Sequence, residues 1–304
     1  MIWRVEKFDW ITATSVAMNS TALKDCAEIC LDAGGFLTGS FGRAVAICAL
    51  QDTGKLSFID EPPVTWKNLG ASYVGNHPAY TSKLAGDIDF FFPTEEIGDA
   101  AVQALSLGGE KHRLSDAENM HEWFRKSSAG FATEFFLRDG LMFQLITKNV
   151  GTPREVTDSF DISNAKVYLT RGEIHYTDEW LKLEQDRELG IHRVDKPNLV
   201  WRGYKWFNRG AYNGFSEGSD SKYVDAVMLE AKRLHEAQAA RNDQKVSTNV
   251  IRIDAKATWP TWELIQNRKI TLPKTLLKAS YLFDGYKNLE IIRRVREEIQ
   301  RRNP

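Results

Sequence analysis

Cysteine is scarce in this sequence, and long hydrophobic runs and a strong net charge are absent. Its 304 residues include only three cysteines, Cys26, Cys30 and Cys48, which are too few and too clustered for a disulfide framework. We therefore expect a reducing, cytoplasmic compartment. No apolar stretch reaches the roughly 18–20 residues that span a bilayer, so we expect no membrane partner. The N-terminal residues carry charges where a signal peptide has its apolar stretch, so we expect no secretion signal.

A near-zero net charge hides a difference between two parts of the chain. Lys and Arg number 40 and Asp and Glu number 41, so the formal net charge is -1. Residues 190–304 hold 22 basic and 13 acidic residues, a net of +9, whereas residues 1–189 hold 18 and 28, a net of -10. Either both parts are ordinary solvated surfaces, or the acids hold cations and the bases meet a polyanion.

The order of the patterns predicts two domains of different class. Hydrophobic residues make up 42% and charged residues 27%, a composition typical of a globular protein. Helix and strand patterns alternate up to residue 177, and helix patterns follow from residue 178. We therefore expect an α+β fold, in which residues 1–189 form a mixed β-sheet with helices against one face. Residues 190–304 are expected to form a mainly helical, basic domain.

Caps, breakers and periodicity predict the individual elements. Asn19 or Ser20 caps a first helix, which Gly34 and Gly35 end, and Asp139-Gly140 predicts the turn of a hairpin. Residues 51–83 are polar, contain Pro and Gly, and predict an inserted loop or a small hairpin. The predicted helices are 22–33, 41–50, 94–105, 115–124, 153–158, 178–189, 197–209, 220–242 and 290–302, and the predicted strands include 36–38, 86–92 and 172–177.

The strongest chemical signal is a pair of carboxylates in an apolar strand. Asp87 and Asp89 point to the same face of that strand, while Ile88 points to the other. Two like charges side by side are costly unless something compensates them, and a divalent cation such as Mg²⁺ or Mn²⁺ does so directly. The alternative is that both acids lie at an exposed strand end and are solvated.

Two further features fit a site for a phosphorylated substrate. Gly39 and Ser40 lie between a strand and a helix, where backbone and hydroxyl donors can hold a phosphate, and Arg43 follows in the first helical turn. An ordinary tight turn is the alternative for the Gly-Ser pair. A third acid, Asp161, stands at the entry to another strand; Asp158 is its rival but lies in a polar turn. Three acids on neighbouring strands can hold two Mg²⁺ ions.

A basic helix is predicted after the first domain. Arg202 and Lys205 lie three residues apart within 197–209 and share a face, and aromatic residues are interleaved with them. One interpretation is a solvated basic face whose aromatics pack on the neighbouring domain. The other is a stacked base with the two cations on its phosphates.

These motifs resemble those of a known superfamily. FLTGSFGRA and GDIDFFF look like the Gly-Ser turn and D-x-D strand of the nucleotidyltransferases related to DNA polymerase β. Residues 143–169 and 197–212 are similar to a branch found in large bacteriophages, and the likeness covers roughly residues 20–212. Ser40 and Asp87 are 47 positions apart (87 minus 40), more than the single helix usual in the superfamily, so residues 51–83 are taken as an insertion.

The resemblance implies an enzyme that moves a nucleoside monophosphate from an NTP to an acceptor hydroxyl, in the host cytoplasm if a phage encodes it. It implies that Asp87, Asp89 and Asp161 bind the metal and that Gly39 and Ser40 hold the triphosphate. RNA or tRNA, a protein side chain or a small molecule is the acceptor. The alternatives are a non-catalytic nucleic-acid-binding protein on the same fold and a toxin-like enzyme that modifies a protein or small molecule.

Overall fold

The computed structural model describes residues 2–73, 87–106, 124–127, 133–138 and 141–194, together with 199, 202, 203, 206, 212–223, 225 and 226. The chain divides into two compact units, Met1–Asp186 and Arg187–Pro304. This division lies three residues before the boundary that the sequence predicts. Of the predicted helix 115–124 only Phe124 is described, and it begins the strand Phe124–Ser127, so the prediction is wrong at that residue; the predicted helix 290–302 and most of the second unit lie outside the described residues.

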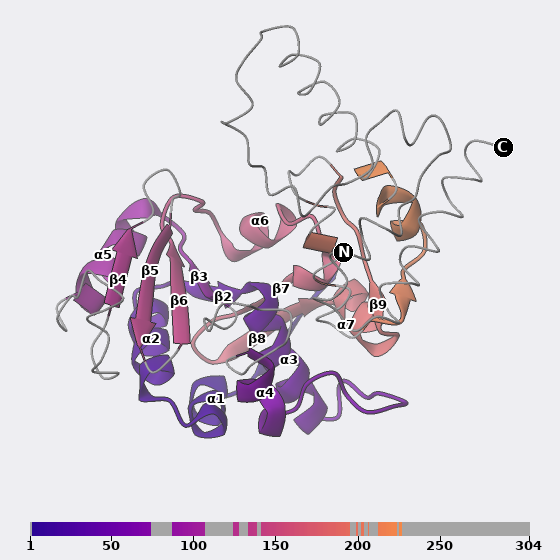
Figure 1. Ribbon diagram of the computed structural model, residues 1–304, viewed down its shortest axis with the longest axis horizontal. Helices are drawn as coiled ribbons and strands as arrows, with labels where there is room; N and C mark the ends of the chain where they lie inside the picture. The colour runs from indigo at the N-terminus through magenta and orange to yellow at the C-terminus, as the bar shows by residue number, and fades with distance from the viewer. Residues whose placement is uncertain are drawn as a thin grey trace, which may run out of the picture. The chain divides into compact units, whose positions relative to one another are not determined.

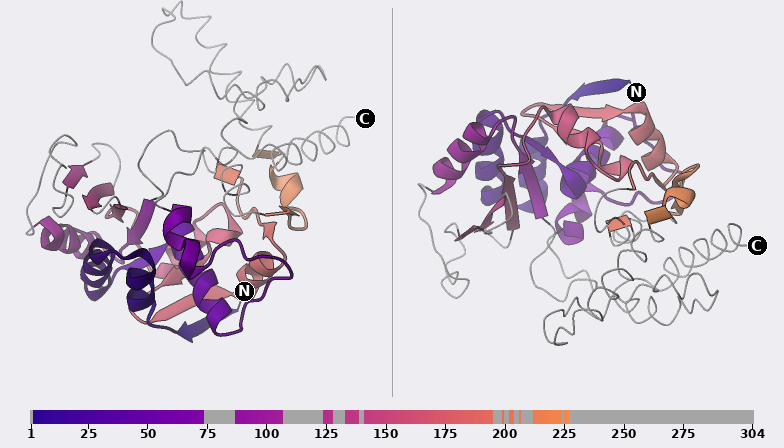
Figure 2. Two further views of the ribbon diagram at one scale, coloured as in Figure 1. Left: turned by 60° about the horizontal axis from the view of Figure 1, so that its bottom comes forward. Right: turned by 90° about the horizontal axis from the view of Figure 1, so that it is seen from above.

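An eight-stranded mixed sheet forms the centre of the first unit (Figure 1). Its strand order is β1-β8-β7-β2-β3-β6-β5-β4, in which β3 and β6 run parallel and all other neighbours run antiparallel. Figure 2 shows β1, in indigo, at the outer edge of this sheet. The α+β prediction is thereby confirmed. The strands are β1 Trp3–Lys7, β2 Phe36–Thr38, β3 Asp87–Phe91, β4 Phe124–Ser127, β5 Thr133–Arg138, β6 Leu141–Ile146, β7 Val167–Leu169 and β8 Glu173–Thr177.

The helices begin and end where local chemistry directs. Ser20 accepts a hydrogen bond from the Leu23 amide and begins α2, as predicted, and Gly34, at φ 93°, follows its end. Thr152 and Glu155 form a capping box at the start of α6. The helices are α1 Trp10–Met18, α2 Thr21–Asp32, α3 Gly39–Asp52, α4 Trp66–Tyr73, α5 Glu95–Ser106, α6 Pro153–Asp158 and α7 Asp178–Gln185, with a 3-10 turn η2 at Ser163–Ala165. In the part of the chain that the structure covers, no helix has both the length and the apolar character to cross a bilayer.

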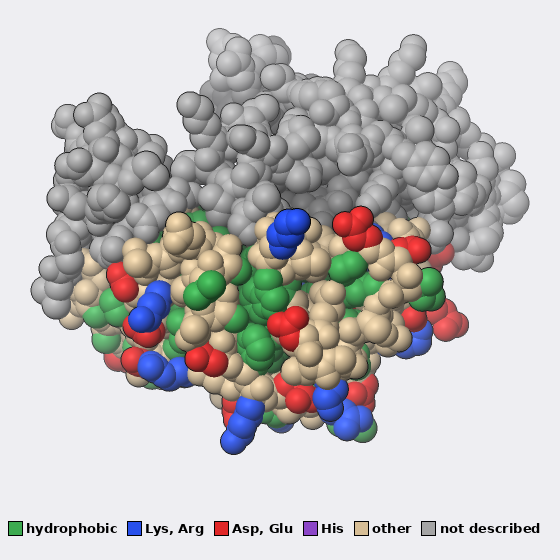
Figure 3. Space-filling view, turned by 90° about the horizontal axis from the view of Figure 1, so that it is seen from below, with side chains coloured by type: hydrophobic (Ala, Val, Ile, Leu, Met, Phe, Trp, Pro, Cys, Tyr) green, Lys and Arg blue, Asp and Glu red, His purple; other side chains and the backbone are tan. Residues whose placement is uncertain are grey.

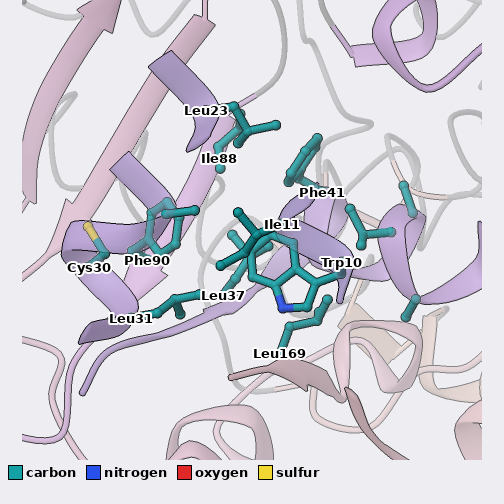
Figure 4. Packing of buried hydrophobic residues seen from close by; sticks show 14 of the residues in the cluster. Trp10, Ile11, Leu23, Cys30, Leu31, Leu37, Phe41, Ile88, Phe90 and Leu169 are labelled. Carbon is teal, nitrogen blue, oxygen red and sulfur yellow. The ribbon is translucent and has the colours of Figure 1, made fainter. Parts of the chain in front are cut away.

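The main core lies between one face of the sheet and helices α1 to α5. Leu37, Ile88, Phe90 and Leu169 point from the central strands into this core and are at most 1% exposed (Figure 4). Helix α3 lies directly against strands β2, β3 and β7 and is almost entirely buried, from Phe41 to Leu50. Each buried aliphatic or aromatic side chain contributes about 1.5–3 kcal/mol relative to exposure, so this layer stabilises the packing of the helices on the sheet.

The opposite face of the sheet carries a smaller, aromatic cluster under α6. Phe36, Phe91 and Tyr168 pack there with Val156 of α6. Figure 1 shows α6 on the side of the sheet opposite to α1, α3 and α4. Because side chains alternate along a strand, each residue that faces this cluster stands between neighbours that face the main core.

Two predicted segments differ from the structure. Residues 66–73, predicted as loop or hairpin, form helix α4, because Val64 and Leu69 bury their side chains in the main core. Residues 74–86 lie outside the described part. The first 18 residues, for which the sequence predicts no helix or strand, form β1 and α1; β1 is an edge strand that is exposed or half-buried throughout.

The second unit is described only in parts. Strands β9 Glu188–Leu189 and β10 Gly214–Phe215 pair in parallel. Residues 199, 202, 203 and 206 have helical backbone, within the predicted helix 197–209. Residues 220–223, 225 and 226 also have helical backbone, within the predicted helix 220–242. Residues 188 and 189, predicted as the end of helix 178–189, form β9 instead.

Candidate active site

Asp89 stands at the centre of the sheet on the face opposite the main core. Its neighbours Ile88 and Phe90 are 1% and 0% exposed within the core, and Asp89 itself is half-buried. The register pairs Asp89 with Thr38 on β2 and with Gln144 on β6. The D-x-D strand is therefore a central strand of the sheet, flanked on both sides.

Gly39 brings the Gly-Ser turn into contact with this carboxylate. Its backbone has φ 75°, and a Cβ placed on it would lie 2.9 Å from Oδ2 of Asp89. A side chain at Gly39 would thus be strained by the backbone and would collide with the carboxylate. Gly39 and half-buried Ser40 begin α3, so the amide groups at the helix start lie beside Asp89.

The two other predicted metal ligands are placed less completely. Asp87 is the first residue of β3 and pairs with Met142 of β6. Its backbone is described, but its side chain is not. Asp161 is fully buried, at 0% exposure. The sequence places Asp161 at a strand entry; in the structure it lies between α6 and η2, and β7 begins only at Val167.

An aromatic contact places the Asp161 segment on the same face as Asp89. The ring of Phe160 lies 5.9 Å from the ring of Phe91 at an interplanar angle of 61°. Phe91 is two residues after Asp89 on β3 and therefore faces the same way. The backbone that carries Asp161 thus lies over the Asp89 face of the sheet, which supports a shared site.

Arg43 is placed differently from the phosphate contact that the sequence predicts. Its side chain is 6% exposed and forms a bidentate ion pair with Glu184 of α7: Nε donates to Oε1 at 2.8 Å and Nη2 to Oε2 at 2.5 Å. Asn164 of η2 donates to the same Oε1 at 2.9 Å. The structure thus gives Arg43 a partner inside the protein, which the sequence analysis did not foresee.

Arg202 and Lys205 belong to the second unit. Arg202 has helical backbone and a half-buried side chain, while Lys205 lies outside the described residues. Their proposed contact with phosphates remains a prediction.

The donor chemistry at Asp89 fits a hard divalent cation. Carboxylate oxygens are the ligands that Mg²⁺ and Mn²⁺ prefer, and Asp89 places its carboxylate against Gly39 at the helix start, where a side chain would collide with it. Among the residues that the structure describes, no three His, Cys, Asp or Glu side chains gather closely enough to hold a metal. Since the Asp87 side chain is not described, the three-aspartate site stays a prediction.

The sequence analysis missed a buried lysine near these residues. Lys166 directly precedes β7, and its side chain is 1% exposed. Its Nζ lies 3.4 Å from Oδ1 of Asp158, which is half exposed. A lysine between Ala165 and Val167, in an otherwise apolar run, was the signal that could have found it.

No protein-family model matches the sequence, and a search of curated proteins finds no match. Solved structures do match. A CCA-adding enzyme in complex with CTP has a TM-score of 0.50 at 12% identity, over 97% of this chain and 55% of that chain. The fold resembles that of a CCA-adding enzyme.

A second solved structure, the Thermotoga maritima CCA-adding enzyme complexed with tRNA, has a TM-score of 0.49 at 11% identity, again over 97% of this chain and 55% of that chain. This chain therefore spans little more than half the length of the CCA-adding enzymes it matches. At such identity the likeness concerns the fold, and the chemistry has to be argued from the residues of this chain.

Proposed function

We propose that this protein is a nucleotidyltransferase that transfers a nucleoside monophosphate from an NTP to a hydroxyl of an RNA, with tRNA as the first acceptor to test. The observation that carries the proposal is the contact between Gly39 and Asp89. It joins a helix start, which suits a triphosphate, to a carboxylate, which suits a cation. The fold shared with a CCA-adding enzyme is consistent with this chemistry.

The proposed reaction forms one bond and breaks one. The acceptor oxygen attacks the α-phosphorus of the NTP, the bond from that phosphorus to the bridging oxygen breaks, and pyrophosphate leaves with the electron pair. The hydroxyl proton is lost to solvent or to a nearby base. Asp87, Asp89 and Asp161 are the proposed ligands of Mg²⁺ or Mn²⁺, which when bound would activate the hydroxyl and neutralise the triphosphate.

The residues of this chain have separate proposed tasks. Gly39 leaves room for the carboxylate of Asp89 beside the start of α3, and the amide groups there, with the hydroxyl of Ser40, would donate to the triphosphate. The burial of Asp161 would limit the number of water molecules near the reacting oxygen. Arg202 and Lys205 are proposed to contact phosphates of the NTP or of the acceptor.

The test is transfer from α-labelled NTPs. Each of ATP, CTP, GTP and UTP is incubated with the protein, Mg²⁺ and either tRNA lacking its 3′ end, total RNA, a protein mixture or no acceptor. We expect label on RNA with release of pyrophosphate. Label on protein or on a small molecule would replace RNA as the acceptor, as the toxin-like alternative predicts. RNA binding without any transfer would favour the non-catalytic alternative.

A further inference from the structure

A buried polar network connects three segments around the candidate active site. Glu184 accepts hydrogen bonds from Arg43 of α3 and Asn164 of η2, and all three residues are almost fully buried. Trp180, one turn earlier on α7, donates from Nε1 to the carbonyl oxygen of Asn164 at 2.9 Å. Helix α7 is thus hydrogen-bonded through its side chains to both α3 and η2.

The two segments that α7 connects carry the proposed site residues, Gly39 at the start of α3 and Asp161 before η2. Arg43 lies four residues after Gly39, one helical turn into α3, so its position determines where the helix start lies. Asn164 lies three residues after Asp161, at the end of the same short segment. A shift of Glu184 would therefore move the proposed triphosphate site and the third aspartate relative to each other.

The network uses a geometry that only arginine supplies. Two N–H groups of the Arg43 guanidinium donate to the two oxygens of the Glu184 carboxylate, and a third donor, the side-chain amide of Asn164, donates to Oε1 from another segment. Buried ion pairs add little net stability compared with apolar side chains of similar size, because the cost of desolvating the two charged groups opposes their attraction. The pair differs from an apolar contact mainly in its directional hydrogen bonds, which fix the position of α3 relative to α7.

We infer that Arg43, Glu184 and Asn164 are positioning residues, which hold the proposed triphosphate-binding turn at Gly39 and the segment of Asp161 in the relative arrangement that nucleotidyl transfer requires. This inference rests on the proposed function for its catalytic consequence. Its structural part, the coupling of the two segments through Glu184, does not depend on that function.

The test compares three variants. Arg43→Lys keeps the charge and loses the bidentate geometry. Arg43→Met/Glu184→Met removes both charges, keeps apolar volume and should retain the fold, since apolar replacement of a buried ion pair is often neutral or stabilising. The control is Arg4→Lys, because Arg4 forms the same bidentate contact with Asp178 at the surface, with side chains 55% and 46% exposed.

Two readouts are taken on each full-length variant: amide hydrogen exchange in residues 36–44 and 159–166 without nucleotide, and kcat/KM for NTP transfer. We expect both segments to exchange faster in Arg43→Lys and in the double variant than in the wild type. We expect kcat/KM to fall about 10²-fold, the loss typical of a misplacement of about 1 Å. The double variant should have the melting temperature of the wild type but keep the lowered kcat/KM, and Arg4→Lys should match the wild type in both readouts.

The inference is overturned if the folded double variant shows wild-type exchange in both segments, whatever its activity. It is also overturned if activity returns together with stability, because the network would then be purely structural. A wild-type protein that transfers no nucleotide, while the two segments still respond together, removes the proposed function and retains the coupling through Glu184.

Discussion

Gly39 is the residue of the candidate site at which a side chain is least tolerated. Its φ of 75° and the 2.9 Å between its hypothetical Cβ and Asp89 Oδ2 are two separate obstacles to any side chain. Gly54 offers a matched comparison, since it has φ 68° and nothing within 4 Å of a Cβ. The difference between the two glycines isolates the contact with Asp89.

We predict that Gly39→Ala destabilises the protein more than Gly54→Ala does. Gly54→Ala should cost about 1–2 kcal/mol, the typical penalty of a left-handed backbone for a non-glycine residue. Gly39→Ala should cost more, because Asp89 must also move. Urea denaturation measures both, and adding Asp89→Ala should remove the excess. Equal losses in the two single variants would contradict the contact.

His175 is a residue whose protonation should make the stability of the protein depend on pH. Burial lowers the pKa of its imidazole below the ordinary 6.5, and the nearby Glu173 carboxylate only partly opposes this. The ring stacks on Tyr168 at 4.4 Å, Nε2 lies 3.1 Å from Glu173, and Nδ1 is buried with no hydrogen-bond partner in the described part of the chain. Protonation would place an N–H at Nδ1 where no acceptor is available.

We predict that the wild type loses stability relative to His175→Phe as the pH falls from 7 through 6.5 and below. Between the lowered folded pKa and 6.5 the unfolded chain binds more protons than the folded one, so acid favours unfolding there. Phe retains the stacking on Tyr168 and does not titrate. Denaturation series at pH 5.5, 6.5 and 7.5 check this prediction, and a wild type that gains stability in acid relative to the variant would refute it.

At the scale of elements, the sequence predicted what local chemistry determines. Asn19 and Ser20 were the two predicted caps of α2, and the structure uses Ser20. Gly34 at the end of α2, the hairpin between β5 and β6 and the helical turn at 153–158 are confirmed, because each depends on neighbouring residues. β1 was missed because an edge strand that is exposed along its length has no clean apolar alternation. Helix α4 was missed because its burial depends on contacts with distant α1.

The candidate site shows the same division. The placement of Asp89 on a strand face opposite to Ile88 follows from strand alternation. A helix was predicted directly after the Gly-Ser pair, over 41–50, whereas α3 already begins at Gly39. The partner of Arg43 lies 141 residues away, and no local pattern predicts such a contact. Asp161 was assigned to a strand entry because its apolar neighbours resemble a strand, whereas in the structure it lies between α6 and the 3-10 turn Ser163–Ala165.

Thr38 links the elements at the site and carries the prediction at this scale. Its Oγ1 donates to the carbonyl oxygens of Val167 at 2.6 Å and Ala165 at 3.3 Å, so it joins the start of α3 to η2 and β7. Thr38→Val should cost about 1–3 kcal/mol, because buried carbonyl groups lose their donor. Thr38→Ser, which keeps the hydroxyl, should cost less. Denaturant unfolding of the two variants decides this, and an equal cost would show that only packing matters.

At the scale of the whole molecule, the basic residues are in excess in the C-terminal part of the chain and the acidic residues in the N-terminal part. On the face shown in Figure 3, which lies on the side of α1 and α4, acidic and basic side chains are interspersed among hydrophobic ones. Residues 190–304 carry the excess of +9, including Arg202 and Lys205. A polyanionic acceptor is therefore expected to bind through the second unit.

We predict that RNA binding weakens steeply with salt. The logarithm of the affinity should fall by roughly 0.7–0.9 for each phosphate contacted per tenfold rise in salt, and Arg202→Ala or Lys205→Ala should reduce that slope by about one unit. Titration of labelled tRNA at several salt concentrations measures the slope, with Lys7→Ala in the first unit as the control. A flat salt response would remove nucleic acid from the partners of this protein.

The most direct test of the central claim is nucleotide transfer by Asp89→Asn. Asn keeps the size of the side chain but removes the charge that a cation requires. Asp99→Asn, at an exposed position on α5, is the matched control. In the assay with labelled NTPs, tRNA and Mg²⁺, the account predicts no transfer by Asp89→Asn, full transfer by Asp99→Asn and a wild-type melting temperature or higher for both. Undiminished transfer by folded Asp89→Asn would contradict it.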